Sequence, residues 1–259
     1  MIDMHSHIVF DVDDGSDSLD ESLAIIKRAY IKGIKAMFAT SHYIDGSMTA
    51  EASEVKDKLE ILRSKLKEEN IEMELLCGHE VFLDHEIIDH VKSGKALSLN
   101  DSRYILVELP MMNELTNLED ILFDMTIKGY VPIIAHPERY SYVQRDINCV
   151  RKWIDSGALL QLNLPTFHNK YGDIARKTAE EILERQMYHF VGSDVHVYKS
   201  RALSIEEPLS RVKSIVGEAI YMDMVENNPT KVIQNDTIEP FEVLELKTSF
   251  FKRMRKLIG

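Results

Sequence analysis

The sequence predicts an α/β fold in which seven parallel strands form a (β/α) barrel similar to a TIM barrel. Apolar, β-rich runs alternate with helical patterns along the chain. The runs lie at 2–9, 34–40, 72–77, 104–109, 130–135, 158–164 and 188–193. Seven such units favour a closed parallel barrel over an open sheet. No internal repeat or long linker divides the 259 residues, so we predict one domain over 1–259 that ends in a short basic tail, about 248–259.

The helix-starting and helix-ending residues between the strands agree with this alternation. The first expected helix starts at a capping box, Ser18-x-x-Glu21, and Thr116-x-x-Glu119 predicts a similar start for the helix before residue 130. The apolar face of the first helix consists of Leu19, Leu23, Ile26 and Tyr30. Glycines occur where a left-handed residue is expected after a helix, at Gly33, Gly129 and Gly157. The stretch after residue 218 or so predicts a further helix and an irregular tail.

Composition limits the class of partner. The chain is 44% hydrophobic and 29% charged, which is typical of a globular protein. Its 31 basic and 43 acidic residues give a net charge of −12, which disfavours a nucleic-acid partner. We recognise neither a secretory signal nor a membrane span, so we expect a cytoplasmic protein. Cys77 and Cys149 are expected to be free thiols.

The most informative motif is His5-x-His7 at the end of the first predicted strand. Side chains two residues apart in an extended segment point the same way, so both imidazoles can face one cation. Such a pair alone also fits ordinary surface or core histidines. However, six of the seven strands end in a His, Glu or Asp, and only the sixth, which ends near Asn163, does not. The carboxyl ends of barrel strands form the rim where active sites are built.

The residue types at this rim predict a metal centre. With Asp14 from the loop after the first strand, the candidate ligands are His5, His7, Asp14, His42, Glu80, Glu108, His136, Asp194 and His196. One tetrahedral ion needs about four ligands, so nine indicate two or three ions with open positions. Imidazole and carboxylate without thiolate favour Mn, Fe or Zn. Any single member, such as Glu108, also fits a buried acid with ordinary hydrogen-bond partners.

Two classes of phosphatase do not fit the residues. A cysteine phosphatase needs Cys-x5-Arg, but the positions six residues after the two cysteines are Leu83 and Asp155. A haloacid-dehalogenase-type start is imitated by Asp11-Val-Asp13, but Gly15 stands where that motif has Thr or Val. That interpretation also leaves the histidines without a role.

The motifs resemble those of the PHP (polymerase and histidinol phosphatase) superfamily along nearly the whole chain. They are Met1-Ile-Asp-Met-His-Ser-His7, Asp13-Asp14-Gly15, Ala39-Thr-Ser-His42, Gly78-His-Glu80, Val107-Glu108, Ile134-Ala-His-Pro-Glu-Arg139 and Gly192-Ser-Asp-Val-His196. Their order and spacing are most similar to the manganese-dependent bacterial protein-tyrosine phosphatases of capsule and exopolysaccharide loci. This resemblance implies a distorted seven-stranded barrel of the PHP type and hydrolysis of phosphotyrosine.

The resemblance also implies residue roles. One ion would be held by His5, His7, Glu80 and Asp194. A second would be held by Glu80, Glu108 and His136, with Glu80 bridging, and a third by Asp14, His42 and His196. Arg139 and Arg201 match the family's phosphate-contacting arginines and are the predicted catalytic and substrate-binding residues. The implied cofactor is Mn²⁺, and the implied substrate is a membrane-attached bacterial tyrosine kinase.

Some expectations remain open at this point. Ser41 and Tyr43 replace the family's usual Pro and His on either side of His42, a predicted ligand of the third ion, and Val195 replaces Ala. Histidinol phosphate phosphatase, a metal-dependent nuclease and a non-catalytic kinase-binding regulator are the alternatives. The amphipathic tail Phe250–Ile258 is basic and suggests weak contact with anionic lipid. His85 and His90 are expected at the surface of a predicted helix.

Overall fold

The seven strands form one parallel sheet in the sequence order β1-β2-β3-β4-β5-β6-β7. The computed structural model describes residues 1–199 and 203–245, so Arg201 and the predicted basic tail lie outside the described residues. The strands are β1 (Ile2–Ser6), β2 (Ala36–Tyr43), β3 (Glu74–Phe82), β4 (Tyr104–Glu108), β5 (Val131–Ala135), β6 (Leu159–Asn163) and β7 (Phe190–Gly192). Each predicted run contains or overlaps one of them, so the predicted strand order is confirmed.

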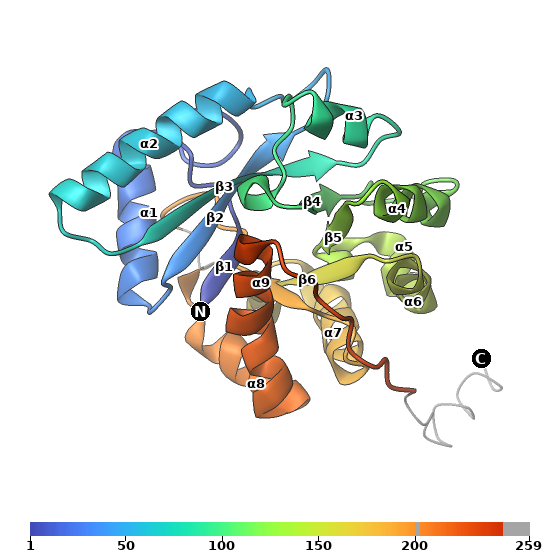
Figure 1. Ribbon diagram of the computed structural model, residues 1–259. Coiled ribbons are helices and arrows are strands. Elements are labelled where there is room, and N and C mark those ends of the chain that lie inside the picture. Colours follow the sequence, from blue (N-terminus) through green and yellow to red (C-terminus); the bar gives the residue numbers. More distant parts are fainter. Residues whose placement is uncertain (200–202, 246–259) are drawn as a thin grey trace.

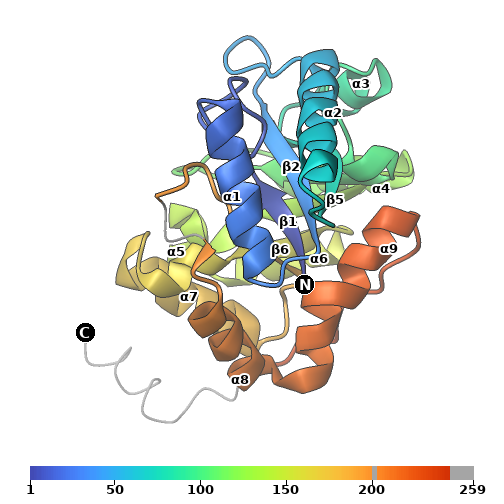
Figure 2. The same ribbon diagram turned by 90° about the vertical axis from the view of Figure 1, so that its left-hand side faces the viewer.

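Helices surround the sheet on its outer side (Figures 1 and 2). They are α1 (Leu19–Ile31), α2 (Ala52–Glu68), α3 (Ile87–Lys92), α4 (Leu118–Ile127), α5 (Ser141–Arg145), α6 (Asn148–Asp155), α7 (Gly172–Glu184), α8 (Glu206–Met222) and α9 (Asn228–Gln234). Short 3-10 segments are η1 (Leu99–Asp101), η2 (Pro137–Arg139) and η3 (Leu164–His168), and η5 (Asp223–Asn227) is a π-helical turn between α8 and α9. Within the described ranges, no helix is both long and apolar enough to cross a membrane.

The sheet is a nearly closed barrel because β1 meets the chain just beyond β7. The His7 amide donates to the Val195 carbonyl at 2.9 Å, and the Asp194 amide donates to the His5 carbonyl at 2.8 Å. The Ser193 amide also donates to the Asp3 carboxylate at 2.8 Å. The predicted seven-stranded barrel is therefore confirmed, and its closure joins the two ends of the sheet directly at the rim.

Side chains alternate between two apolar layers along each strand. One layer, which includes Phe38, Leu106 and Phe190, fills the barrel interior and extends to Val232 of α9. The other, which includes Met37, Val107 and Val191, packs against the outer helices. Because Val232 of α9 packs in the same layer as Ile2 at the start of β1, α9 covers the amino-terminal end of the barrel (Figure 1).

Helix ends match the sequence in part. Ser18 caps α1 by accepting a hydrogen bond from the Glu21 amide at 3.3 Å. The capping box predicted at Thr116 is wrong, because Asn117, at φ 63°, precedes α4 without a side-chain cap. Gly33, Gly129 and Gly157 all have positive φ, as predicted.

Two further expectations concern single residues. Both cysteines are free thiols, as predicted. His90 is not at the surface: it is 5% exposed, and its Nε2 lies 3.4 Å from the Asp84 carboxylate. The side chain turns toward Tyr43, whose hydroxyl lies 3.5 Å from His90 Nδ1. The helical periodicity around His90 could not show that Tyr43 of β2 lies beside it, because the two residues are far apart in the sequence.

His189 should make the fold sensitive to acid. Its Nδ1 accepts the Leu160 amide at 3.1 Å, its ring stacks on Phe241, and burial lowers its pKa to about 3 from 6.5. The native state therefore keeps this imidazole neutral, while the unfolded chain takes up a proton below pH 6.5. Stability is fully present above that pH and falls as the pH is lowered toward 3.

We expect His189→Asn, which keeps an acceptor near the Leu160 amide, to reduce this acid sensitivity. Between about pH 7.5 and about pH 5, the variant should lose about 2 kcal/mol less unfolding free energy than the wild type. Urea unfolding at the two pH values measures this difference. An equal loss in both proteins would show that His189 does not titrate on unfolding.

Candidate metal centre

The first group of predicted ligands converges on one point inside the rim. His5 Nε2 lies 3.1 Å from His7 Nε2, 3.1 Å from Glu80 Oε2 and 3.5 Å from Asp194 Oδ1. His7 Nε2 lies 3.4 Å from Glu80 Oε2 and 3.5 Å from Asp194 Oδ1. All four side chains are buried. Two imidazoles and two carboxylates thus direct one atom each toward a shared centre.

The partners on the far side of each imidazole fix which nitrogen faces that centre. His7 Nδ1 lies 2.8 Å from the Asp13 carboxylate, and His5 Nδ1 lies 3.0 Å from Gln161 Oε1. The Gln161 amide is oriented because its Nε2 donates to the Leu162 carbonyl at 2.6 Å. In the neutral form of each ring, Nδ1 therefore carries the hydrogen and Nε2 presents a lone pair to the shared centre. Two lone pairs 3.1 Å apart beside two carboxylates fit a cation between them.

A second group shares Glu80 with the first. Glu80 Oε1 lies 3.0 Å from His136 Nε2, while Glu80 Oε2 faces the first centre. Glu108 Oε1 lies 3.8 Å from the same nitrogen of His136. The two oxygens of Glu80 therefore point to different centres, which is the geometry of a bridging carboxylate.

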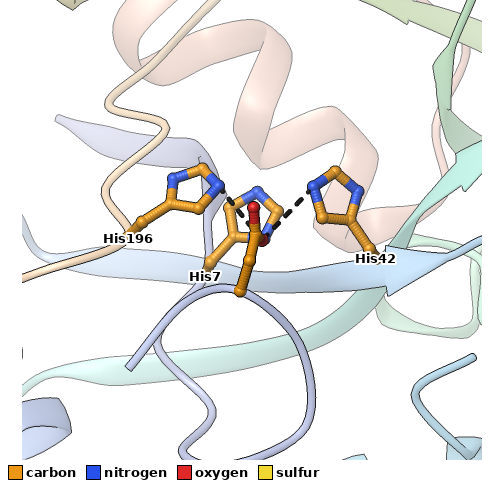
Figure 3. Close-up of side chains that lie close together, drawn as sticks. His7, His42 and His196 are labelled. Carbon is orange, nitrogen blue, oxygen red and sulfur yellow. Dashed lines mark ion pairs between the residues drawn. The ribbon is translucent and has the colours of Figure 1, made fainter. Parts of the chain in front are cut away.

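A third group lies nearer the solvent. Asp14 Oδ1 is 3.6 Å from His42 Nε2 and 3.5 Å from His196 Nε2 (Figure 3). The His7 ring stacks on the His196 ring, with centroids 3.9 Å apart. Figure 3 shows His7, His42 and His196 gathered around one carboxylate. The structure thus brings all nine predicted ligands together, and their role as metal ligands stays a prediction.

Charge within the site is unbalanced. Burial opposes ionisation of Glu80, but His5, His136 and His7 outweigh it and hold its pKa well below its usual range. Burial, followed by repulsion from Glu80, raises the pKa of Glu108 to about 8. Burial lowers the pKa of His136 to about 4. Burial opposes protonation of His5 and His7, but the neighbouring carboxylates outweigh it and raise the pKa of both imidazoles. Carboxylates that attract positive charge in this way, beside imidazole nitrogens, form a donor set suited to divalent cations.

Local backbone features aim the ligands. The register between β1 and β2 shifts between Asp3 and Ser6. Met4 belongs to the interior apolar layer, and the adjacent His5 faces the site. Such irregularities re-aim side chains near active sites. His136 and Asp194 have φ values of 35° and 48°, a strained left-handed conformation that the surrounding contacts maintain.

Gly192 allows β7 to approach the site closely. A Cβ at this position would lie 2.6 Å from His5 Cβ and 2.7 Å from Gln161 Nε2. We expect Gly192→Ala to displace both residues, to lower stability by about 1–3 kcal/mol and to weaken Mn²⁺ binding. Thermal unfolding and Mn²⁺ titration measure the two effects. The control is Gly94→Ala, which has positive φ but no atom within 4 Å of the added carbon, so only stability should change.

The sequence alone did not identify several residues that form hydrogen bonds with the predicted ligands. Asp13 orients His7 and accepts the His42 amide at 2.9 Å. Gln161 orients His5, and Asn163 donates to Asp194 Oδ2 at 2.6 Å. The sixth strand thus contributes neutral polar groups in place of charged ones. The two-residue spacing of Gln161 and Asn163 was the available signal.

A cavity of about 460 Å³ opens over the three groups. Its lining includes Arg139, Ile44 and Met48 beside the predicted ligands. Arg139 is 24% exposed, and its Nη1 lies 3.3 Å from Asp194 Oδ2. One of the two predicted arginines is therefore at the site, and the position of Arg201 is outside the described residues.

The two unusual residues beside His42 point away from the cavity. Ser41 and Tyr43 are buried, and neither lines the cavity. The Tyr43 ring stacks on His79, with centroids 5.7 Å apart. Because side chains alternate along β2, His42 faces the site between these two neighbours. Ser41 and Tyr43 therefore lie outside the cavity that His42 enters.

The family model for capsular polysaccharide synthesis proteins CpsB/CapC matches residues 1–234. The chain belongs to this family. The CpsB/CapC relatives include the tyrosine-protein phosphatase CpsB of Streptococcus pneumoniae, 30% identical over 243 residues, which cover 92% of this chain and 100% of the relative. The tyrosine-protein phosphatase YwqE of Bacillus subtilis is 29% identical over 238 residues, 92% and 93% of the two chains.

Two solved structures share the fold of this chain. The first comes from work on YwqE from Bacillus subtilis and CpsB from Streptococcus pneumoniae, which are metal-dependent tyrosine phosphatases, and it has a TM-score of 0.87 at 29% identity. It covers 95% of this chain and 100% of its own. A histidinol phosphate phosphatase from Lactococcus lactis has a TM-score of 0.56 at 16% identity over 83% of this chain and 93% of its own. That second similarity shows the fold alone. The predicted family resemblance is thus confirmed.

Proposed function

We propose that this chain is a metal-dependent protein-tyrosine phosphatase. The observation that carries the proposal is the convergence of imidazoles and carboxylates from the strand ends beneath a cavity that also contains Arg139. The CpsB/CapC relatives with this fold are named tyrosine phosphatases. Divalent ions in such a site would activate a water molecule near neutral pH and neutralise charge on a phosphoryl group.

The chain's own residues supply the rest of the chemistry. His5, His7, Glu80 and Asp194 would hold one ion, His136 and Glu108 would complete a second site with Glu80, and Asp14, His42 and His196 would hold a third. Arg139 presents planar donors that suit phosphoryl oxygens. A tyrosinate leaving group, with a phenol pKa near 10, needs less protonation than an alkoxide does. This property favours phosphotyrosine over phosphoserine.

Finer features of the proposal rest on the ligand types and the family. Mn²⁺ suits the mixed nitrogen and oxygen donors, in two or three ions, with Fe or Zn as alternatives. The proposed substrate is a membrane-attached bacterial tyrosine kinase of a capsule or exopolysaccharide locus. The single-domain organisation over 1–259, the cytoplasmic location, the role of Arg201 and the lipid contact of the tail stay predictions.

The test combines metal analysis with turnover. Elemental analysis of the purified protein should find two or three ions per chain, and a chelator should abolish hydrolysis of a phosphotyrosine peptide until Mn²⁺ is restored. Parallel assays on histidinol phosphate and single-stranded DNA should give much lower rates. Full turnover after removal of all metal would contradict the proposal. Preference for histidinol phosphate would assign the alternative activity, and no turnover with Mn²⁺ supplied would favour a non-catalytic regulator.

A further inference from the structure

Tyr171 is an aromatic residue in the cavity that neither the predicted ligand set nor the arginine pair includes. It lies between η3 and α7 and lines the cavity with Arg139 and Asp194. Its hydroxyl and its ring contact different members of the site. Each contact can therefore be removed separately by substitution.

The hydroxyl of Tyr171 belongs to a set of donors around one oxygen of Asp194. Asp194 Oδ2 accepts from Asn163 Nδ2 at 2.6 Å, from the Tyr171 hydroxyl at 3.1 Å and from Arg139 Nη1 at 3.3 Å. Asn163 Nδ2 also donates to the Tyr171 hydroxyl at 3.2 Å. With Oδ2 occupied by these donors, the other oxygen, Oδ1, remains directed at His5 and the rest of the first group. Partners of this kind orient a metal ligand and strengthen metal binding.

The ring of Tyr171 supports the guanidinium of Arg139. The Arg139 Cζ lies 4.5 Å from the ring centroid, and Lys170 Nζ lies 5.1 Å from it. A guanidinium stacked on an aromatic ring keeps its edge free for a planar contact with an oxyanion. Holding the arginine in place before the substrate binds reduces the ordering cost of binding.

We propose that Tyr171 is a positioning residue with two separable actions: its hydroxyl fixes the Asp194 carboxylate for metal binding, and its ring fixes Arg139 for binding a phosphoryl group. This inference rests on the proposed function, and it adds a residue that acts through Asp194 and Arg139 without touching the reacting atoms. The two actions predict different defects in two variants.

Tyr171→Phe removes the hydroxyl and keeps the ring. We expect its Mn²⁺ affinity, measured by competition with a chromogenic chelator, to fall about tenfold, as is usual when a partner of a metal ligand is removed. Inorganic phosphate should bind the Mn²⁺-saturated variant as it binds the wild type. An unchanged Mn²⁺ affinity would overturn the assignment of the hydroxyl.

Tyr171→Leu removes both the hydroxyl and the ring. Its Mn²⁺ affinity should match that of Tyr171→Phe, and its dissociation constant for inorganic phosphate, measured by calorimetry on Mn²⁺-saturated protein, should rise about tenfold. In an Arg139→Ala background the same substitution should leave phosphate binding unchanged, because the ring acts through Arg139. An equal rise in both backgrounds would overturn the assignment of the ring. Normal phosphate binding with weaker peptide binding would overturn it too, because the ring would then contact the substrate itself.

These readouts do not depend on turnover. If the wild type binds Mn²⁺ and phosphate but does not hydrolyse a phosphotyrosine peptide, the proposed function fails while the two actions of Tyr171 are still decided. If the wild type is active and both variants bind Mn²⁺ and phosphate normally, the inference fails alone. Thermal unfolding of both variants identifies any general loss of structure.

Discussion

Replacing Glu80 by glutamine (Glu80→Gln) is expected to reduce phosphotyrosine hydrolysis by about 10³-fold or more. The two oxygens of Glu80 face different groups, with Oε1 3.0 Å from His136 and Oε2 3.1 Å from His5. Glutamine keeps the volume but removes the negative charge that both groups share. Elemental analysis should therefore show the loss of at least one bound ion together with the loss of activity.

The control for this variant is Glu226→Gln. Glu226 pairs with Lys35 and the amino terminus at the opposite end of the barrel. The Glu226→Gln protein should keep its metal content and turnover. A folded Glu80→Gln protein with wild-type metal content and full activity would exclude the bridging role of Glu80. Circular dichroism and thermal unfolding establish that the variant is folded.

Arg139→Ala, assayed at saturating Mn²⁺, is expected to lower kcat/KM for a phosphotyrosine peptide by about 10²–10³-fold while the metal ions stay bound. The side chain lines the cavity and approaches Asp194 only through Nη1, at 3.3 Å. Its removal therefore takes away phosphoryl contacts but no predicted ligand. Steady-state kinetics and elemental analysis on the same preparation measure both quantities.

Two further variants interpret that result. Arg139→Lys should restore only part of the activity, because an ammonium lacks the planar fork of the guanidinium. Arg145→Ala, on the exposed side of the adjacent α5, should behave as the wild type. Metal loss from Arg139→Ala even at saturating Mn²⁺ would instead show that the Arg139 contact with Asp194 is needed to hold the ions.

The sequence was enough to group the predicted ligands because they occupy equivalent positions in a repeated unit. Each strand of a parallel barrel delivers its last residues to the same rim. Residues as far apart as His5 and Asp194 could therefore be grouped from strand ends alone, and the structure places them 3.5 Å apart. Histidine, aspartate and glutamate at those positions then indicated metal binding.

Other features depend on neighbours that local patterns do not specify. The Thr116 capping box failed because the chain enters α4 through Asn117 in a left-handed conformation. His90 was expected at the surface, but Tyr43 of β2 lies against it. Glu138 belongs to a recognised motif, yet its buried role, accepting hydrogen bonds from Tyr188 at 2.7 Å and Thr166 at 2.9 Å, appears only in the folded chain.

The sequence by itself determined the strand order, the rim at which the candidate residues gather and the choice of the nine predicted ligands, because these follow from periodicity and from residue type. The tertiary structure alone decided which predicted ligands lie together, which nitrogens of His5 and His7 face their shared centre, and that Gln161, Asn163 and Tyr171 form hydrogen bonds with His5 or Asp194. The physical reason is that hydrogen-bond partners and shared oxygens depend on ångström-scale distances between distant segments. Those distances are set by barrel closure and by the register shift in β1.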